Sequence, residues 1–198
     1  MSKTSTQSDW NITDPPIASL LFSATRLAWI WIPVRLYVAY VWLTSGWGKL
    51  NNPAWMQTGD ALKGFWLNAL KIDPRPVIYF DWYRQFIQFL VDNQAWVWFA
   101  KIIAVGEVLI GIALVLGAFT GIAAFFGAFM NWNFMMAGTA SSNPLLFTLT
   151  ILLILAWKVA GYYGLDRFLL PGVGTPWRPG LILRSKSGER IPEPAVST

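Results

Sequence analysis

The chain has 198 residues, of which 55% are hydrophobic and 13% charged, and its net charge at pH 7 is +5. Soluble domains have about twice that charged fraction, so the composition excludes an ordinary soluble domain and predicts an all-α integral membrane protein. Neither Cys nor His occurs, so we expect no haem, iron–sulfur cluster or zinc and no metal site, and redox work would require a quinone or a partner's cofactor.

The N-terminal part predicts a polar tail followed by one short helix. Asp14-Pro15-Pro16 is typical of a helix start, and residues 17–26 could form an interfacial helix. Residues 1–26 are therefore assigned to an N-terminal tail with an interfacial helix, ahead of a membrane domain that covers residues 27–172.

Four apolar runs in this domain predict a bundle of four transmembrane helices. They lie at about 27–48, 96–116, 119–137 and 144–164. Pro33 is expected to kink the first of them. The long connection between the first two spans is too polar to cross a membrane, and its apolar periodicity predicts amphipathic helices near 55–70 and 79–90.

The last segment, residues 173–198, is rich in proline and basic residues. Five basic residues follow the last apolar run: Arg167, Arg178, Arg184, Lys186 and Arg190. The positive-inside rule places such a tail in the cytoplasm. Four spans then put both termini on the cytoplasmic side of the inner (plasma) membrane, and the basic charge needs no nucleic-acid partner.

Glu107 is the only ionisable side chain between Lys101 and Lys158. A carboxyl group near the middle of a bilayer is costly and usually has a partner or a task. Arg35 and Lys158 have similar predicted depths in the first and fourth spans, so we expect Arg35 to face Glu107 inside the bundle. Such a set could fix the helix register, or it could form a charged cavity that binds an anion or moves protons.

Arg35, Trp42 and Lys49 recur every seven residues and therefore share one face of the first span. Lys49 is expected to be interfacial and easily solvated. Asn131 and Asn133, near the outer end of the third span, could contact a ligand near Lys49 or bond to neighbouring helices. We assign catalysis to Glu107 and Arg35, and substrate or quinone binding to Lys49, Trp42, Asn131, Asn133 and Lys158.

Four segments resemble the DoxD/DoxX family over roughly residues 29–172. They are RLYVAYVWLTSGWGKLNNPAW, GEVLIGIALVLGAFTGIAA, NWNFMMAGTASSNP and LAWKVAGYYGLDRFLLP. The resemblance implies a four-helix membrane bundle. Its DoxD members imply the oxidation of thiosulfate to tetrathionate, with electrons passed to quinone alongside a second subunit called DoxA.

Three hypotheses of function follow. The first is a membrane subunit of a quinone-linked oxidoreductase, in which basic groups bind thiosulfate and Glu107 relays the protons that quinone reduction consumes. The second is a non-catalytic accessory subunit that scaffolds a larger respiratory or photosynthetic membrane complex. The third is a carrier of a small solute or lipid. The expected partners are the lipid bilayer and other redox subunits, with a DoxA-like protein among the candidates.

Overall fold

The computed structural model describes residues 14–174, and these residues form helices and turns without any strand. The elements are α1 (Pro16–Phe22), the 3-10 helix η1 (Thr25–Ile30), α2 (Trp31–Leu50), α3 (Pro53–Met56), α4 (Asp60–Ala69), α5 (Asp81–Asp92), α6 (Trp96–Leu116), α7 (Thr120–Met136), α8 (Asn143–Leu155) and α9 (Asp166–Val173). The all-α prediction is confirmed for this part of the chain. The predicted tails at 1–13 and 175–198 lie outside the described residues.

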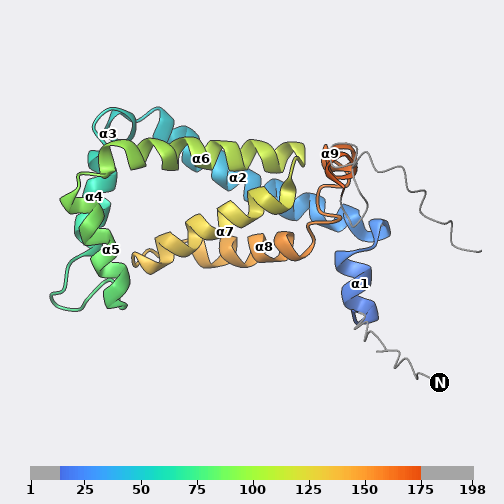
Figure 1. The fold of residues 1–198 in the computed structure, drawn as a ribbon, viewed down its shortest axis with the longest axis horizontal. Coiled ribbons are helices and arrows are strands. Elements are labelled where there is room, and N and C mark those ends of the chain that lie inside the picture. Colours follow the sequence, from blue (N-terminus) through green and yellow to red (C-terminus); the bar gives the residue numbers. More distant parts are fainter. Residues whose placement is uncertain (1–13, 175–198) are drawn as a thin grey trace, which may run out of the picture.

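The helices α2, α6, α7 and α8 form an elongated bundle (Figure 1). Within it α2 packs mainly on α6, and α7 packs mainly on α8. The helices α3, α4 and α5, which belong to the long connection, gather at one end of the bundle, here called the loop end. The first and last described helices, α1 and α9, lie at the opposite end, here called the terminal end.

Two glycines set the register of α2 against α6. A Cβ atom on Gly46 would lie 2.9 Å from the Cβ atom of Glu107, and one on Gly111 would lie 2.6 Å from Cγ of Leu43. Because glycine has no side chain, the two backbones approach closely at both points. This contact places Glu107 beside the last two turns of α2.

Two segments of the described residues are long and apolar enough to cross a membrane, namely Thr25–Leu50 and Trp96–Leu116. Pro33 lies in the first turn of α2, and the change from η1 to α2 occurs just before it. The third predicted span corresponds to α7, with 17 residues.

The fourth predicted span, 144–164, is only partly a helix. The helix α8 has 13 residues and ends at Leu155, and residues 156–165 form consecutive turns. At 1.5 Å per residue, α8 is about 20 Å long, which is shorter than the roughly 30 Å hydrocarbon core of a bilayer. The turns lead to α9, which makes a polar contact with the α6–α7 connection, described below.

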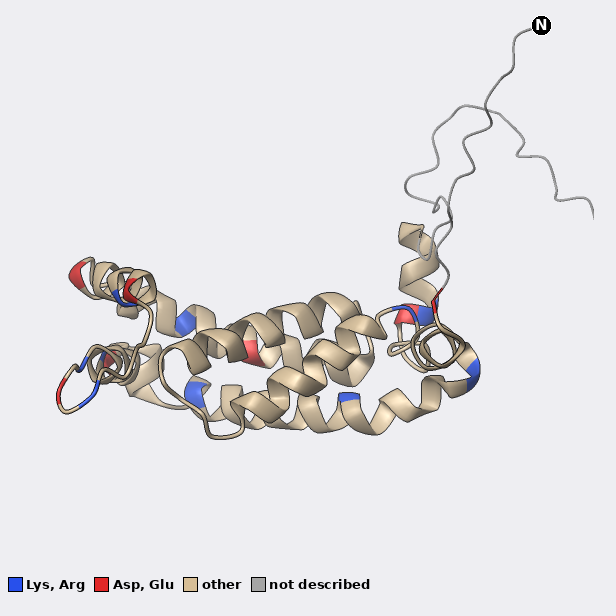
Figure 2. Ribbon diagram, turned by 90° about the horizontal axis from the view of Figure 1, so that it is seen from below, with Lys and Arg blue, Asp and Glu red and all other residues tan. Residues whose placement is uncertain are grey.

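Charged residues gather at the two ends of the bundle and are scarce along its middle (Figure 2). The outward side chains of α6 and α7 are large and apolar, and more than half exposed in several cases: Ile102, Leu109, Ile122, Phe125, Phe126 and Phe129. An apolar outer surface with charged ends matches a bundle embedded in lipid.

Candidate functional site

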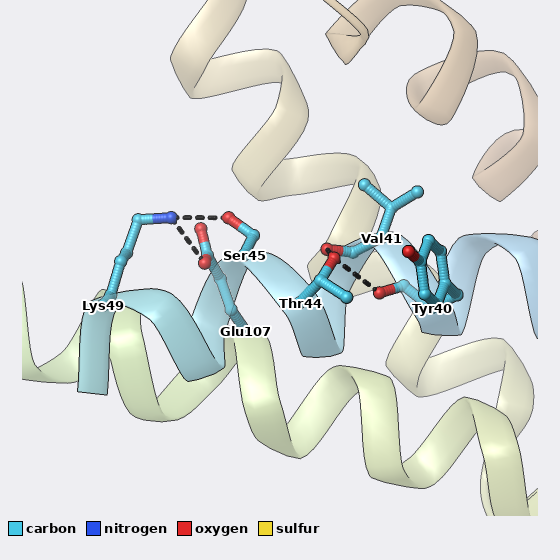
Figure 3. Close-up of polar contacts among 6 residues, drawn as sticks. All are labelled: Tyr40, Val41, Thr44, Ser45, Lys49 and Glu107. Atoms are coloured by element: carbon cyan, nitrogen blue, oxygen red, sulfur yellow. Dashed lines mark hydrogen bonds and ion pairs between the residues drawn. The ribbon is translucent and has the colours of Figure 1, made fainter. Parts of the chain in front are cut away.

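Lys49 and Glu107 form a buried ion pair near the loop end of the bundle. Lys49 Nζ lies 2.6 Å from Glu107 Oε2 and donates a second hydrogen bond to Ser45 Oγ at 2.7 Å (Figure 3). The Glu107 side chain is 1% exposed and that of Lys49 is 17% exposed. Lys49 was predicted to be interfacial and easily solvated, and it does lie at the end of α2. Its ammonium group, however, turns back along α2 because the buried carboxylate needs a counter-charge.

Arg35 does not face Glu107, so this prediction is also wrong. Arg35 Nη1 donates to the Ala160 carbonyl oxygen at 3.4 Å, and its guanidinium is attracted by the carboxylate of Asp166. The α2 residue beside Glu107 is Gly46, which is roughly 16 Å along the helix axis from Arg35. Depth estimates from span centres missed this because the glycine contacts, not the centres, set the helix register.

Asp166 closes the terminal end of the bundle. Its carboxylate oxygens accept hydrogen bonds from the backbone N–H groups of Phe119 (2.5 Å) and Thr120 (2.9 Å), and its own N–H donates to the Gly117 carbonyl oxygen at 2.7 Å. These bonds satisfy donors at the start of α7 that have no partner within the helix. Arg35 and Asp166 therefore have a structural task, here called the clasp.

A cavity of about 260 Å³, here called the polar cavity, lies beside the ion pair. It is lined by the ion pair, by Trp42 and Ser45 of α2, and by Asn131 of α7. Aromatic side chains and the polar turn after α7 also line it: Trp55, Phe65, Phe134, Thr139, Ser141, Ser142 and Asn143. The structure thus brings together four of the predicted site residues, Trp42, Lys49, Glu107 and Asn131. Sequence reasoning missed the aromatic walls and the turn, although the polar stretch GTASSN was a visible signal.

Two side chains in the polar cavity have unused hydrogen-bonding atoms. Asn131 is fully buried, and neither its Oδ1 nor its Nδ2 atom has a partner among residues 14–174; the same holds for Nε1 of Trp42. Leaving a buried polar group unpaired costs about 1–3 kcal/mol. These unpaired donors and the acceptor belong to residues that line the cavity, so they favour the interpretation that a polar group binds there.

Asn133 and Lys158 lie outside the polar cavity. The Tyr83 hydroxyl donates to the Asn133 carbonyl oxygen (3.0 Å) and to its Oδ1 (3.2 Å), and Asn133 Nδ2 donates to the Phe129 carbonyl oxygen. Burial raises the pKa of Tyr83 to about 12, so this hydroxyl stays a donor at neutral pH. Lys158 is half-buried in the turns after α8.

A family model for DoxX matches residues 30–140, which is more than half of the chain. The chain belongs to the DoxX family. No curated protein and no solved structure matches the chain.

The matched part of this DoxX protein runs from the start of α2 to the turn after α7. It contains both partners of the ion pair and also Trp42 and Asn131, whereas Asp166 lies beyond it. DoxX is a membrane family, so the protein lies in the lipid bilayer.

Proposed function

We propose that this DoxX protein is the membrane subunit of a quinone-linked oxidoreductase and that the polar cavity receives the quinone headgroup. The observation that carries the proposal is the set of unpaired buried donors, Trp42 Nε1 and Asn131 Nδ2, beside the Lys49–Glu107 pair. A quinone is flat and carries carbonyl acceptors. The aromatic walls of the cavity suit the ring, and an unpaired buried donor suits a carbonyl oxygen.

The chemistry to be served is a two-electron, two-proton reduction. Two thiosulfate ions release two electrons when they join through a new S–S bond as tetrathionate, and the quinone takes up those electrons with two protons to give hydroquinone. Hydrogen bonds from Trp42 and Asn131 would stabilise negative charge that develops on the carbonyl oxygen. Lys49 and Glu107 line the same cavity, so a proton held by the pair could reach that oxygen.

Thiosulfate oxidation is better assigned to a partner subunit than to this cavity. Among residues 14–174, the charged side chains that line the polar cavity are Lys49 and Glu107, which carry opposite charges. A dianion would enter without net attraction and would compete with Glu107 for the ammonium group. We therefore propose that a DoxA-like partner supplies the electrons and that this chain holds the quinone.

Removing one donor should weaken quinone binding. We expect Trp42→Phe and Asn131→Leu each to raise the Kd of a tail-less 1,4-benzoquinone by about five- to tenfold, the value of one buried hydrogen bond. Trp31→Phe is the matched control, since Trp31 is also buried on α2 but its Nε1 donates to the Leu21 carbonyl oxygen at the terminal end. Equilibrium dialysis of the purified protein measures the binding.

Asn131→Leu should also raise the stability of the ligand-free protein, by about 1–3 kcal/mol, because it removes an unpaired buried amide without leaving a void. Unfolding by SDS titration in mild detergent measures this change. If the Asn131→Leu protein is less stable than the wild type and binds quinone equally well, the amide serves only to hydrogen-bond neighbouring helices. The accessory scaffold function would then replace the proposal.

We further propose that the bundle crosses the membrane four times, with α8 and its following turns as the last span, the termini in the cytoplasm and the loop end outside. Figure 1 supports this arrangement, because α1 and α9 lie together at the end opposite α3, α4 and α5. Reporter fusions are expected to place Thr198 inside and Asp73 outside. A C-terminal fusion that is active only outside the cell would reverse the orientation.

A further inference from the structure

A second cavity, of about 130 Å³, lies among α4, α5, α6 and α7, and is here called the apolar cavity. Its wall is formed by aliphatic and aromatic side chains, with Tyr83 and Asn133 as the polar members. These two are hydrogen-bonded to each other, and the Asn133 amide also donates to a backbone oxygen. Because its polar groups are already paired, this cavity suits hydrocarbon rather than a polar ligand.

The two cavities are separated by one pair of rings. Phe65 and Phe134 line both cavities, and their rings meet edge to face with centroids 6.3 Å apart. On its other side the apolar cavity reaches the outer surface at Phe86 and Phe129, which are 42% and 53% exposed. The two cavities therefore adjoin at this ring pair, and the apolar cavity is lined on its other side by exposed side chains of α5 and α7.

We propose that the apolar cavity holds the hydrocarbon tail of the same ligand whose headgroup occupies the polar cavity, and that this ligand enters sideways from the bilayer between α5 and α7. This inference rests on the proposed function, since it takes the headgroup to be a quinone. A ligand that fits both cavities is amphipathic. Its carbonyl groups accept hydrogen bonds from the unpaired donors of the polar cavity, and its hydrocarbon chain packs against the wall of the apolar cavity, where the polar groups are already paired. The ring pair of Phe65 and Phe134 is the passage between the two.

Filling the apolar cavity tests the inference. Ile87 lines this cavity and is 2% exposed, whereas Phe89 lies on the same helix, is 62% exposed and does not line it. Ile87→Trp adds bulk to the cavity, and Phe89→Trp adds bulk outside it as the matched control. The probes are a 1,4-benzoquinone with a decyl tail and the same quinone without a tail, each measured with wild type and variants in one detergent, so that partitioning cancels in the ratios.

We expect Ile87→Trp to raise the Kd of the decyl quinone about tenfold or more, as for about two methylene groups pushed out of an apolar site. The Kd of the tail-less quinone should change less than about twofold, and Phe89→Trp should change neither. If Ile87→Trp does not fold, Ile87→Phe should also raise the Kd of the decyl quinone selectively, but by a smaller factor.

Equal effects of Ile87→Trp on both quinones, or none on either, would overturn the tail assignment while leaving the proposed headgroup site intact. Failure of the wild type to bind either quinone would instead overturn the proposed function, and the tail assignment with it. Binding of the decyl quinone that depends on Ile87 but not on Asn131 would also contradict the inference, since one ligand is then not shared by both cavities.

Discussion

Replacing Lys49 with methionine is expected to lower the free energy of unfolding by about 3–5 kcal/mol, because the substitution leaves the carboxylate of Glu107 buried without its counter-charge. Glu107 is 1% exposed and lies in the middle of α6. Lys101→Met is the matched control on α6, since Lys101 is exposed. Its effect should stay within about 0.5 kcal/mol. SDS titration in mild detergent measures both.

Substituting the other partner, as in Glu107→Gln, should lower the free energy of unfolding by less. In Glu107→Gln the amide oxygen can still accept from Lys49, and Lys49 is close enough to the end of α2 to reach water. Lys49→Met combined with Glu107→Leu should regain much of the loss, since well-packed apolar side chains often replace a buried ion pair without penalty. Additive effects of the two substitutions would show that the two groups do not stabilise each other.

Gly161→Ala is expected to cost about 3 kcal/mol or more, because it breaks the clasp. An added Cβ atom at Gly161 would overlap Oδ2 of Asp166 and would lie 2.5 Å from Oγ1 of Thr120. The carboxylate would have to leave the start of α7, and the overpacking and the loss of its hydrogen bonds to Phe119 and Thr120 both destabilise. Thermal unfolding of the purified protein measures the loss.

The control for this substitution is Gly48→Ala. Gly48 is an exposed residue of α2, and an added Cβ atom there would meet nothing within 4 Å. Alanine should therefore stabilise the helix by about 0.5–1 kcal/mol. Asp166→Asn should resemble Gly161→Ala in direction but be milder, because one oxygen remains to accept a backbone hydrogen bond. A Gly161→Ala protein as stable as Gly48→Ala would rule out the clasp as a stabilising contact.

The sequence predicted the helices well where apolar runs have sharp ends. The second span was placed at 96–116, where the structure has α6, because Gly117 and the short turn after it end the run. The fourth predicted span, 144–164, is helical only as far as Leu155, although the apolar turns that follow have the composition of a helix. Their course depends on Asp166, whose partners are distant in sequence.

The candidate site was predicted in part. The spacing of Trp42 and Lys49 put both on one face of the first span, and both line the polar cavity with Glu107. The pairing of Arg35 could not be predicted from depth alone, because the offset between α2 and α6 is set by where Gly46 and Gly111 permit contact. A single sequence contains these glycines but not their partners.

The most direct test of a quinone headgroup in the polar cavity is a crystal structure of the protein with a brominated 1,4-benzoquinone, in which anomalous scattering locates the bromine atom. We predict a peak inside the cavity, with a carbonyl oxygen within hydrogen-bonding distance of Trp42 Nε1 or Asn131 Nδ2 and the ring near Lys49 and Glu107. A bromine peak only on the outer, lipid-facing surface, with the cavity filled by ordered water bonded to Asn131, would contradict the account.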